Sequence, residues 1–275
     1  MAAPHRAPTP IAVTIAGSDS GGGAGIQADL KAFSALGVYG ASVLTALTAQ
    51  NTRGVTAIHD VPAEFVAQQM DAVFSDLAVN AVKIGMLSRP EVIETVAAGL
   101  DRHRLETVVL DPVMVAASGD RLLRPEAMET LRRHLLPRAL LITPNLPEAA
   151  ALLDMPQART PKEMRAQAER LLAFGARAVL VKGGHGDGPF SIDVLIDADG
   201  VSEYAAPRIA TANTHGTGCT LSSAIAAGLA RGLKLRAAVQ AAKDYLTRAI
   251  AESDRLSIGH GHGPVHHFHA LWPHL

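Results

Sequence analysis

The sequence predicts an α/β fold, with a mostly parallel central sheet covered by helices on both faces and small β elements at one edge. Three observations predict it. Its short β-branched runs are continuously apolar rather than alternating, as strands buried on both faces require. Segments of helical periodicity separate these runs, which gives a βαβα order and right-handed crossovers. The 275 residues are 48% hydrophobic and 19% charged, which suits a globular chain with a sizeable core.

The strands are predicted first. Runs rich in β-branched residues occur at Ile11–Ala16, Val43–Leu47, Ala81–Ile84, Val108–Leu110, Ala139–Ile142 and Ala178–Val181. A hairpin interrupts the alternation, because Asp193–Ile196 and Val201–Tyr204 flank the dipeptide Asp199-Gly200. This dipeptide favours a type I′ turn.

The helices follow from apolar spacing and from proline positions. Apolar residues share one helical face at Ile26, Leu30, Phe33 and Leu36, and again from Phe65 to Val73. Pro62 is placed where a first helical turn tolerates proline, with Glu64 inside that turn. Further helices are predicted at Pro90–Arg104, Pro125–Leu135, Pro161–Phe174, Gly218–Arg231 and Lys234–Asp254.

Composition excludes several classes of partner and location. We expect a disordered arm at residues 1–10 and a single domain at 11–275, since no repeat or long linker interrupts the chain. The formal charge is −1, which leaves no large electrostatic footprint for nucleic acid or anionic membrane. Ala32–Thr52 is uncharged but too rich in glycine and polar residues for a membrane helix. A single cysteine, Cys219, suits a reducing compartment, so we expect a soluble cytoplasmic protein.

A glycine loop follows the first predicted strand. Gly17–Gly25 contains five glycines in nine residues, which permits close approach of the backbone to a ligand. Gly23–Ala28 also fits the dinucleotide pattern G-x-G-x-x-G/A, but no acidic residue lies between Asp29 and Asp60 to complete it. The loop is therefore either a ligand-binding loop or a tight turn between strand and helix.

Polar groups also follow the fourth, fifth and sixth predicted strands, where ligands of open parallel sheets bind. Asp111–Met114 leads to Ser118–Asp120, and Thr143–Glu148 presents Asn145 and Glu148 on one turn. Such hard oxygen ligands suit Mg²⁺, although Glu148 could instead be an acid that favours the start of a helix. Lys182–His185 follows the sixth strand and suits phosphate, with a solvated lysine as the alternative.

The strongest signal is Asn213–Thr220, directly before the apolar helical segment Leu221–Leu229. Its glycines leave backbone N–H groups free at a helix N-terminus, which is an anion-binding arrangement. The same dipole is expected to lower the pKa of Cys219, which would make this thiol a base or nucleophile; a buried, inert cysteine is the alternative. Six of the twelve histidines lie in the last sixteen residues, and we interpret them as a flexible tail without a defined metal site.

These motifs together resemble the hydroxymethylpyrimidine/phosphomethylpyrimidine kinases of thiamine biosynthesis, which belong to the ribokinase-like superfamily. The resemblance spans roughly residues 11–270, in order and without a large insertion. It is carried by Thr14–Asp19, Gly22–Lys31, Thr45–Thr52, Lys83–Leu87, Asp111–Met114, Thr143–Glu148, Lys182–His185, Thr214–Thr220 and Gly263–His267.

The resemblance implies a role for each matching residue. Gln50 would contact the aminopyrimidine, in a pocket lined by Gly17, Asp29, Met86 and Val113. The ATP phosphates would face Lys182, Asp111, Thr214, His215 and Thr217, with Mg²⁺ held by Asn145 and Glu148 near Asp111. Cys219 would be the general base, and Gly216 and Gly218 would form the loop that stabilises the transferring group. No role is assigned to Lys83.

The resemblance implies an enzyme that uses MgATP to phosphorylate 4-amino-5-hydroxymethyl-2-methylpyrimidine and then its monophosphate, most simply as a homodimer. The second step starts from an ionised phosphate and needs no base. A pyridoxal or pyridoxine kinase is the alternative, because its substrate is also a hydroxymethyl heteroaromatic. A non-catalytic nucleotide-binding or regulatory protein with the same fold is a third interpretation.

Overall fold

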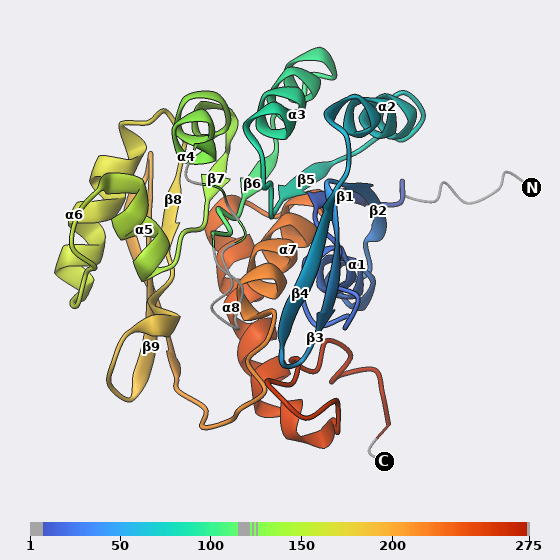
Figure 1. Ribbon diagram of the computed structural model, residues 1–275. Helices are drawn as coiled ribbons and strands as arrows, with labels where there is room; N and C mark the ends of the chain where they lie inside the picture. The colour runs from blue at the N-terminus through green and yellow to red at the C-terminus, as the bar shows by residue number, and fades with distance from the viewer. Residues whose placement is uncertain (1–7, 115–121, 123, 125, 274–275) are drawn as a thin grey trace, which may run out of the picture.

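The computed structural model describes residues 8–114, 122, 124 and 126–273 (Figure 1). Most of the predicted N-terminal arm and the motif Ser118–Asp120 lie outside the described residues. No helix within the described ranges is long and apolar enough to cross a membrane.

The central sheet has eight strands in the order β10-β9-β8-β7-β6-β5-β1-β2. Its bounds are β1 Ile11–Ala16, β2 Tyr39–Leu44, β5 Ala81–Ile84, β6 Val108–Leu110, β7 Leu141–Ile142, β8 Val179–Val181, β9 Phe190–Asp197 and β10 Gly200–Pro207. The pairings from β2 through β8 are parallel. The β9–β10 hairpin joins the edge in antiparallel pairing. The predicted, mostly parallel fold class is confirmed.

Helices cover both faces of this sheet (Figure 1). One face packs against α1 Gly25–Ala35, α7 Thr217–Ala230 and α8 Leu235–Ala251. The other packs against α2 Ala63–Phe74, α3 Pro90–Arg102, α4 Ala127–Thr130, α5 Leu146–Leu153 and α6 Pro161–Leu172. After α4 the chain widens into a π-helical turn, Leu131–Leu135, and a 3₁₀ turn, Leu136–Arg138. The two faces therefore bury separate apolar clusters, and β1, β5, β6, β7 and β8 are covered on both sides.

Local sequence explains where several helices begin. Proline occupies the first turn of α3, where the missing N–H costs nothing. In α5 and α6, Asn145 with Glu148 and Thr160 with Glu163 form reciprocal capping boxes. These caps hold the start of α5 directly beside the end of β7.

The predicted strand Val43–Leu47 is wrong as a single element. β2 ends at Leu44, and β3 Ala46–Asn51 leaves the sheet to pair with β4 Gly54–Asp60 as a separate hairpin. The bend at Thr45 is fixed by its N–H, which donates to Ala16 O at 3.0 Å. Much of β4 is exposed, so it lacks the continuous apolar run by which buried strands are recognised.

The β9–β10 hairpin forms where the sequence predicts it, but its turn differs. Asp197 pairs with Gly200, so the connecting residues are Ala198 and Asp199. Neither has a positive φ, whereas Gly200 has φ +104°. A type I′ turn needs positive φ at both central residues and is therefore excluded.

Candidate functional site

A cavity of about 510 Å³ opens at the carboxyl ends of β1, β5, β6, β7 and β8. It brings together fourteen of the fifteen predicted site residues. They are Gly17, Gln50, Met86, Asp111, Val113, Asn145, Glu148, Lys182, Thr214, His215, Gly216, Thr217, Gly218 and Cys219. These residues come from seven separated stretches of the chain, and the fold brings them together.

Asp29 is the exception, because it does not line the cavity. Its side chain is fully buried behind the cavity wall and accepts hydrogen bonds from Lys83 Nζ at 2.8 and 3.0 Å and from Thr14 Oγ1 at 2.6 Å. Ser223 Oγ donates to it as well. With four hydrogen bonds accepted from three side chains, this carboxylate is committed to the protein interior.

Lys83, to which the sequence assigns no role, supplies the charge that balances Asp29. It lies in β5 opposite Thr14 of β1 and also contacts the cavity. Burial disfavours its charge, but Asp29 and the neighbouring acidic groups outweigh this and hold the pKa of Lys83 above its ordinary value. The sequence does contain a signal for this pair, namely a lysine inside the apolar run Ala81–Ile84. A buried lysine is almost always paired with an acidic group.

Gln50 lies at the end of the cavity formed by the β3–β4 hairpin. Its Oε1 lies 3.0 Å from Thr48 Oγ1, whose hydroxyl also lies 2.8 Å from Ser18 O. Nearby, the Met86 carbonyl accepts from Thr45 Oγ1 at 2.8 Å. A Cβ on Gly17 would lie 3.1 Å from Met86 Sδ, so the small residue leaves room for the thioether. The result is a slot with an oriented carboxamide beside apolar walls.

The opposite wall is the anion loop, which we define as residues Thr214–Cys219 at the start of α7. Gly216 caps this helix with φ +79°, a conformation that favours glycine. A Cβ on Gly218 would lie 3.3 Å from Lys182 Nζ, so the Lys182 ammonium lies beside the free N–H groups of the helix. Both features favour a phosphate at this point.

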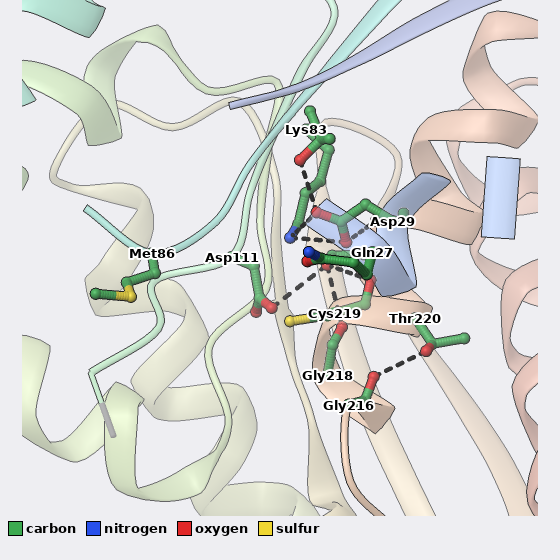
Figure 2. A network of polar contacts seen from close by, with 12 residues as sticks. Gln27, Asp29, Lys83, Met86, Asp111, Gly216, Gly218, Cys219 and Thr220 are labelled. Carbon is green, nitrogen blue, oxygen red and sulfur yellow. Dashed lines mark hydrogen bonds and ion pairs between the residues drawn. The ribbon is translucent and has the colours of Figure 1, made fainter. Parts of the chain in front are cut away.

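Cys219 lies at the centre of the charged groups. Figure 2 shows its sulfur directed toward Asp111, with Lys83 and Asp29 above it in this view. Burial raises the pKa of the Cys219 thiol to about 11, although the Lys83 ammonium lowers it. The predicted lowering is therefore wrong, because desolvation and two carboxylates outweigh the Lys83 ammonium and the helix N-terminus.

Asp111, Glu148 and Lys182 form a second charged cluster at the cavity wall. Lys182 Nζ lies 2.6 Å from Asp111 Oδ1 and 3.9 Å from Glu148 Oε2. Burial raises the pKa of Asp111, but Lys182 and Lys83 outweigh it and keep the group ionised. Burial, helped by Asp111, raises the pKa of Glu148 to about 7. One ammonium thus faces two carboxylates, which leaves the cluster short of positive charge.

The predicted magnesium ligands Asn145 and Glu148 also cap α5. Asn145 Oδ1 accepts from Glu148 N at 2.8 Å, and Glu148 Oε2 accepts from Asn145 N at 2.7 Å. Nowhere in the described parts of the chain do three or more His, Cys, Asp or Glu side chains gather as a metal cage. The hard oxygens present fit an Mg²⁺ that arrives on nucleotide phosphates and keeps several waters.

Sequence reasoning missed the far end of the cavity. Lys243 Nζ donates to Asp193 Oδ2 at 2.7 Å and to Ser191 Oγ at 3.2 Å, and all three residues line the cavity. Arg208 donates to the carbonyls of Gly183 and Gly184 and so fixes the turn after β8. No sequence motif identified these residues. Ser191 and Asp193 lie in β9, Arg208 directly follows β10, and Lys243 lies in the middle of α8.

The C-terminal histidines do not form a flexible tail. His262 N donates to Thr52 O at 2.9 Å, and Gly263 O accepts from His215 N at 3.0 Å. His267 is buried with Nε2 3.0 Å from Thr220 Oγ1, and burial lowers its pKa to about 3. The glycine-rich composition suggested mobility, but its backbone groups bond to the hairpin tip and to the anion loop.

A parallel sheet of this order, with a cavity that joins a glycine loop to a helix-start anion loop, defines the class of ribokinase-like small-molecule kinases. A solved structure of this class, the ADP complex of Bacillus subtilis pyridoxal kinase, superimposes with a TM-score of 0.87 and 38% identity. The alignment covers 94% of this chain and 98% of that one.

The particular family follows from the sequence. The family described as phosphomethylpyrimidine kinase matches residues 19–266, and the chain belongs to it. The hydroxymethylpyrimidine/phosphomethylpyrimidine kinase of Rhizobium meliloti is 63% identical, over 96% of this chain and 99% of the relative. The enzyme of the same name from Escherichia coli is 58% identical, over 95% and 98%. The chain is therefore an enzyme, a kinase.

Proposed function

We propose that this kinase uses MgATP to phosphorylate 4-amino-5-hydroxymethyl-2-methylpyrimidine and then its monophosphate, for thiamine diphosphate biosynthesis. The observation that carries the proposal is the shape of one cavity. It has the Gln50 carboxamide and the Met86 thioether at one end, and the Lys182 ammonium and the anion loop along its wall. A carboxamide offers a donor and an acceptor, which match the edge of an aminopyrimidine.

Catalysis of phosphoryl transfer is mainly positioning and charge stabilisation. Lys182 and the N–H groups of Gly218 and Cys219 lie where they would meet the oxygens of the transferring phosphoryl group. Their charge and dipoles are fixed before the reaction begins, which is what makes such groups effective. Mg²⁺ would add positive charge where Glu148 and Asp111 leave the cluster short of it.

Cys219 is the proposed acceptor of the hydroxymethyl proton. Because burial raises the pKa of this thiol to about 11, only a small thiolate fraction is present near neutral pH. The first phosphorylation should therefore accelerate as the pH rises toward that pKa. The second phosphorylation starts from an ionised oxygen and needs no such base.

A pyridoxal kinase is the second candidate, since the pyridoxal kinase of Bacillus subtilis shares this fold over nearly its whole length. The deciding experiment is a coupled assay for ADP release with the pyrimidine, its monophosphate or pyridoxal as the acceptor. Greater kcat/KM with pyridoxal than with the pyrimidine would overturn the main proposal. ADP binding without turnover of any acceptor would indicate a non-catalytic nucleotide-binding protein.

The role of Gln50 gives a direct prediction. Gln50→Leu should leave the polar edge of the pyrimidine unpaired and weaken its binding by about 1–3 kcal/mol. Titration calorimetry with the pyrimidine measures this change. Gln69→Leu is the matched control, because Gln69 bonds the backbone of Leu44 and does not line the cavity. Equal pyrimidine affinity in Gln50→Leu and wild type would remove Gln50 from the substrate site.

A single kinase domain at residues 11–275, a homodimer and a cytoplasmic location belong to the same proposal. The exposed side chains of Leu47 on β3 and Ile58 on β4 support an association of two copies through the hairpin. The single cysteine supports a reducing compartment.

A further inference from the structure

Asp19, which has no assigned role, organises the glycine loop between β1 and α1. Its Oδ1 accepts from Gly21 N at 2.8 Å, and its Oδ2 accepts from Gly23 N at 3.0 Å and Ala24 N at 2.8 Å. Only 2% of the residue is exposed. Burial raises the pKa of this carboxyl, but its hydrogen bonds from His215 and the backbone outweigh burial and keep it ionised.

The same carboxylate reaches the anion loop. Asp19 Oδ2 lies 2.8 Å from Nε2 of the buried His215, a residue 196 positions later in the chain. His215 directly precedes Gly216, the N-cap residue of α7. The orientation of the imidazole thus sets where the first free N–H groups of the helix lie.

The two loops also interlock through their backbones. A Cβ on Gly23 would lie 2.3 Å from His215 Cδ2, and a Cβ on Gly216 would lie 1.9 Å from Gly23 O. Both separations are too short for a real side chain. Glycine at these two positions therefore allows the Asp19–His215 contact to form.

On its other side, the glycine loop is bonded to the strand that carries Gln50. Ser20 Oγ donates to Gln50 O and accepts from Gln50 N, both at 2.8 Å. Thr48 Oγ1 donates to Ser18 O at 2.8 Å. Hydrogen bonds thus run from the pyrimidine end of the cavity, through Asp19, to the anion loop.

We propose that Asp19 and His215 are positioning residues that align the anion loop with the acceptor-binding residues. The proposal rests on the proposed function and deepens it, since it names what brings the acceptor oxygen and the transferring phosphoryl group into line. Alignment acts most strongly in the transition state, where a misplacement of about 1 Å can cost roughly 10²-fold in rate. Loss of the contact should therefore lower kcat much more than it raises KM.

Three variants test the contact. His215→Met fills similar space without a donor, whereas His215→Gln keeps an N–H donor near the position of Nε2. Asp19→Asn removes the charge of the acceptor. We expect kcat on the pyrimidine to fall about 10- to 100-fold in the Met and Asn variants, with both KM values within about threefold of wild type. The Gln variant should recover most of the loss.

Asp71→Asn is the matched control. Asp71 Oδ1 lies 2.8 Å from His103 Nε2, so the same chemistry at the same distance joins α2 to α3 away from the cavity. Its kcat should equal that of wild type. ADP affinity, measured by calorimetry in every variant, shows that the nucleotide site is folded; if Asp19→Asn does not fold, the His215 variants decide the question.

Wild-type kcat in His215→Met would overturn the proposal. An equal loss in the Gln and Met variants would also overturn it, because the imidazole itself would then act on the nucleotide. Failure of the proposed function gives a different result, namely no pyrimidine turnover by the wild-type enzyme. In that case pyridoxal serves as the acceptor, and the same ratios among variants are expected.

Discussion

Two buried lysine–aspartate pairs lie on either side of Cys219 and differ in what surrounds them. In the first, Lys83 and Asp29 are both 0% exposed, and Thr14 and Ser223 complete the hydrogen bonds of the carboxylate. In the second, Lys182 and Asp111 have side chains that are 10% and 2% exposed. Glu148 adds a third charge to the second pair only.

This difference in surroundings indicates which of the two ion pairs is available for chemistry. The first pair is charge-balanced and fully hydrogen-bonded, so it contributes a fixed local field and structure. The second carries an extra carboxyl group, Glu148, whose pKa is raised to about 7 by burial and by the charge of Asp111. The carboxyl groups of the second cluster favour a bound cation, and its Lys182 ammonium favours a phosphate. The first pair has no group left for either ligand.

The largest expected effect is at the thiol between the two pairs. Cys219→Ser keeps the anion loop and its N–H groups but removes the thiol, and loss of a general base costs about 10²–10⁴ in rate. The pyrimidine reaction should lose that factor together with its rise with pH, whereas the monophosphate reaction should keep most of its rate. Measuring kcat/KM for both acceptors from pH 6 to 9 checks this. Equal losses for the two acceptors would mean that Cys219 serves the loop alone.

Breaking the balanced pair should affect stability. Lys83→Met leaves Asp29 as an unpaired buried carboxylate, and removal of one partner of a buried pair costs about 3–5 kcal/mol. Urea unfolding measures the loss. The double variant Asp29→Leu, Lys83→Met should recover part of it, because no uncompensated charge remains. A single variant as stable as wild type would show that the pair is not a structural element.

Breaking the second pair should affect catalysis. Lys182→Met removes the donor that we propose for the transferring phosphoryl group, and such a loss costs about 10²–10³ in kcat. Both acceptors should be affected alike, because both reactions transfer the same group. Lys162→Met on the exposed face of α6 is the control. A Lys182→Met enzyme with wild-type kcat would place the phosphates elsewhere in the cavity.

The smallest expected effect concerns Glu148 and magnesium. Because the pKa of this buried carboxyl is raised to about 7, Mg²⁺ must displace its proton below that pH. The Mg²⁺ concentration for half-maximal rate should therefore fall as pH rises from 6 to 8, and Glu148→Gln should need several-fold more Mg²⁺ with less pH dependence. Overlapping metal titrations of variant and wild type would leave Glu148 as a helix-capping residue only.

The same raised pKa predicts the pH dependence of stability. The native state holds the Glu148 proton up to about pH 7, whereas the unfolded chain releases it near its ordinary value of 4.5. The contribution of this group to stability is thus present below about pH 4.5 and is lost as the pH rises through 7. Glu148→Gln should flatten this part of the stability profile in urea unfolding.

Much of the fold could be predicted because its signals are local. Strand Ala81–Ile84 is recognised from a short apolar run, and helices α3 and α6 are recognised from the prolines in their first turns, Pro90 and Pro161. The β3–β4 hairpin could not be predicted in this way, because β4 is largely exposed and its residues do not form a continuous apolar run.

The candidate site shows the same division. Fourteen predicted residues line one cavity. Seven of them follow the carboxyl ends of parallel strands, whereas Gln50 comes from the separate β3–β4 hairpin and Thr214–Cys219 lie at the start of α7. The raised pKa of Cys219 could not be predicted, because it results from burial in the folded protein and from the charges of Asp29 and Asp111, which come from other parts of the chain. The Asp19–His215 contact likewise depends on two glycines that are distant in sequence.

That contact also bears on how the enzyme is made. Asp19 and His215 are separated by 196 positions, which at about 5–20 residues per second means roughly 10–40 s of translation between them. During that interval the glycine loop can form its hydrogen bonds to the Asp19 carboxylate. The anion loop, however, has not yet been synthesised. Pairings of such long range also fold slowly. All of the described strands therefore precede the anion loop in the order of synthesis, and the nucleotide site is completed only after the last of them.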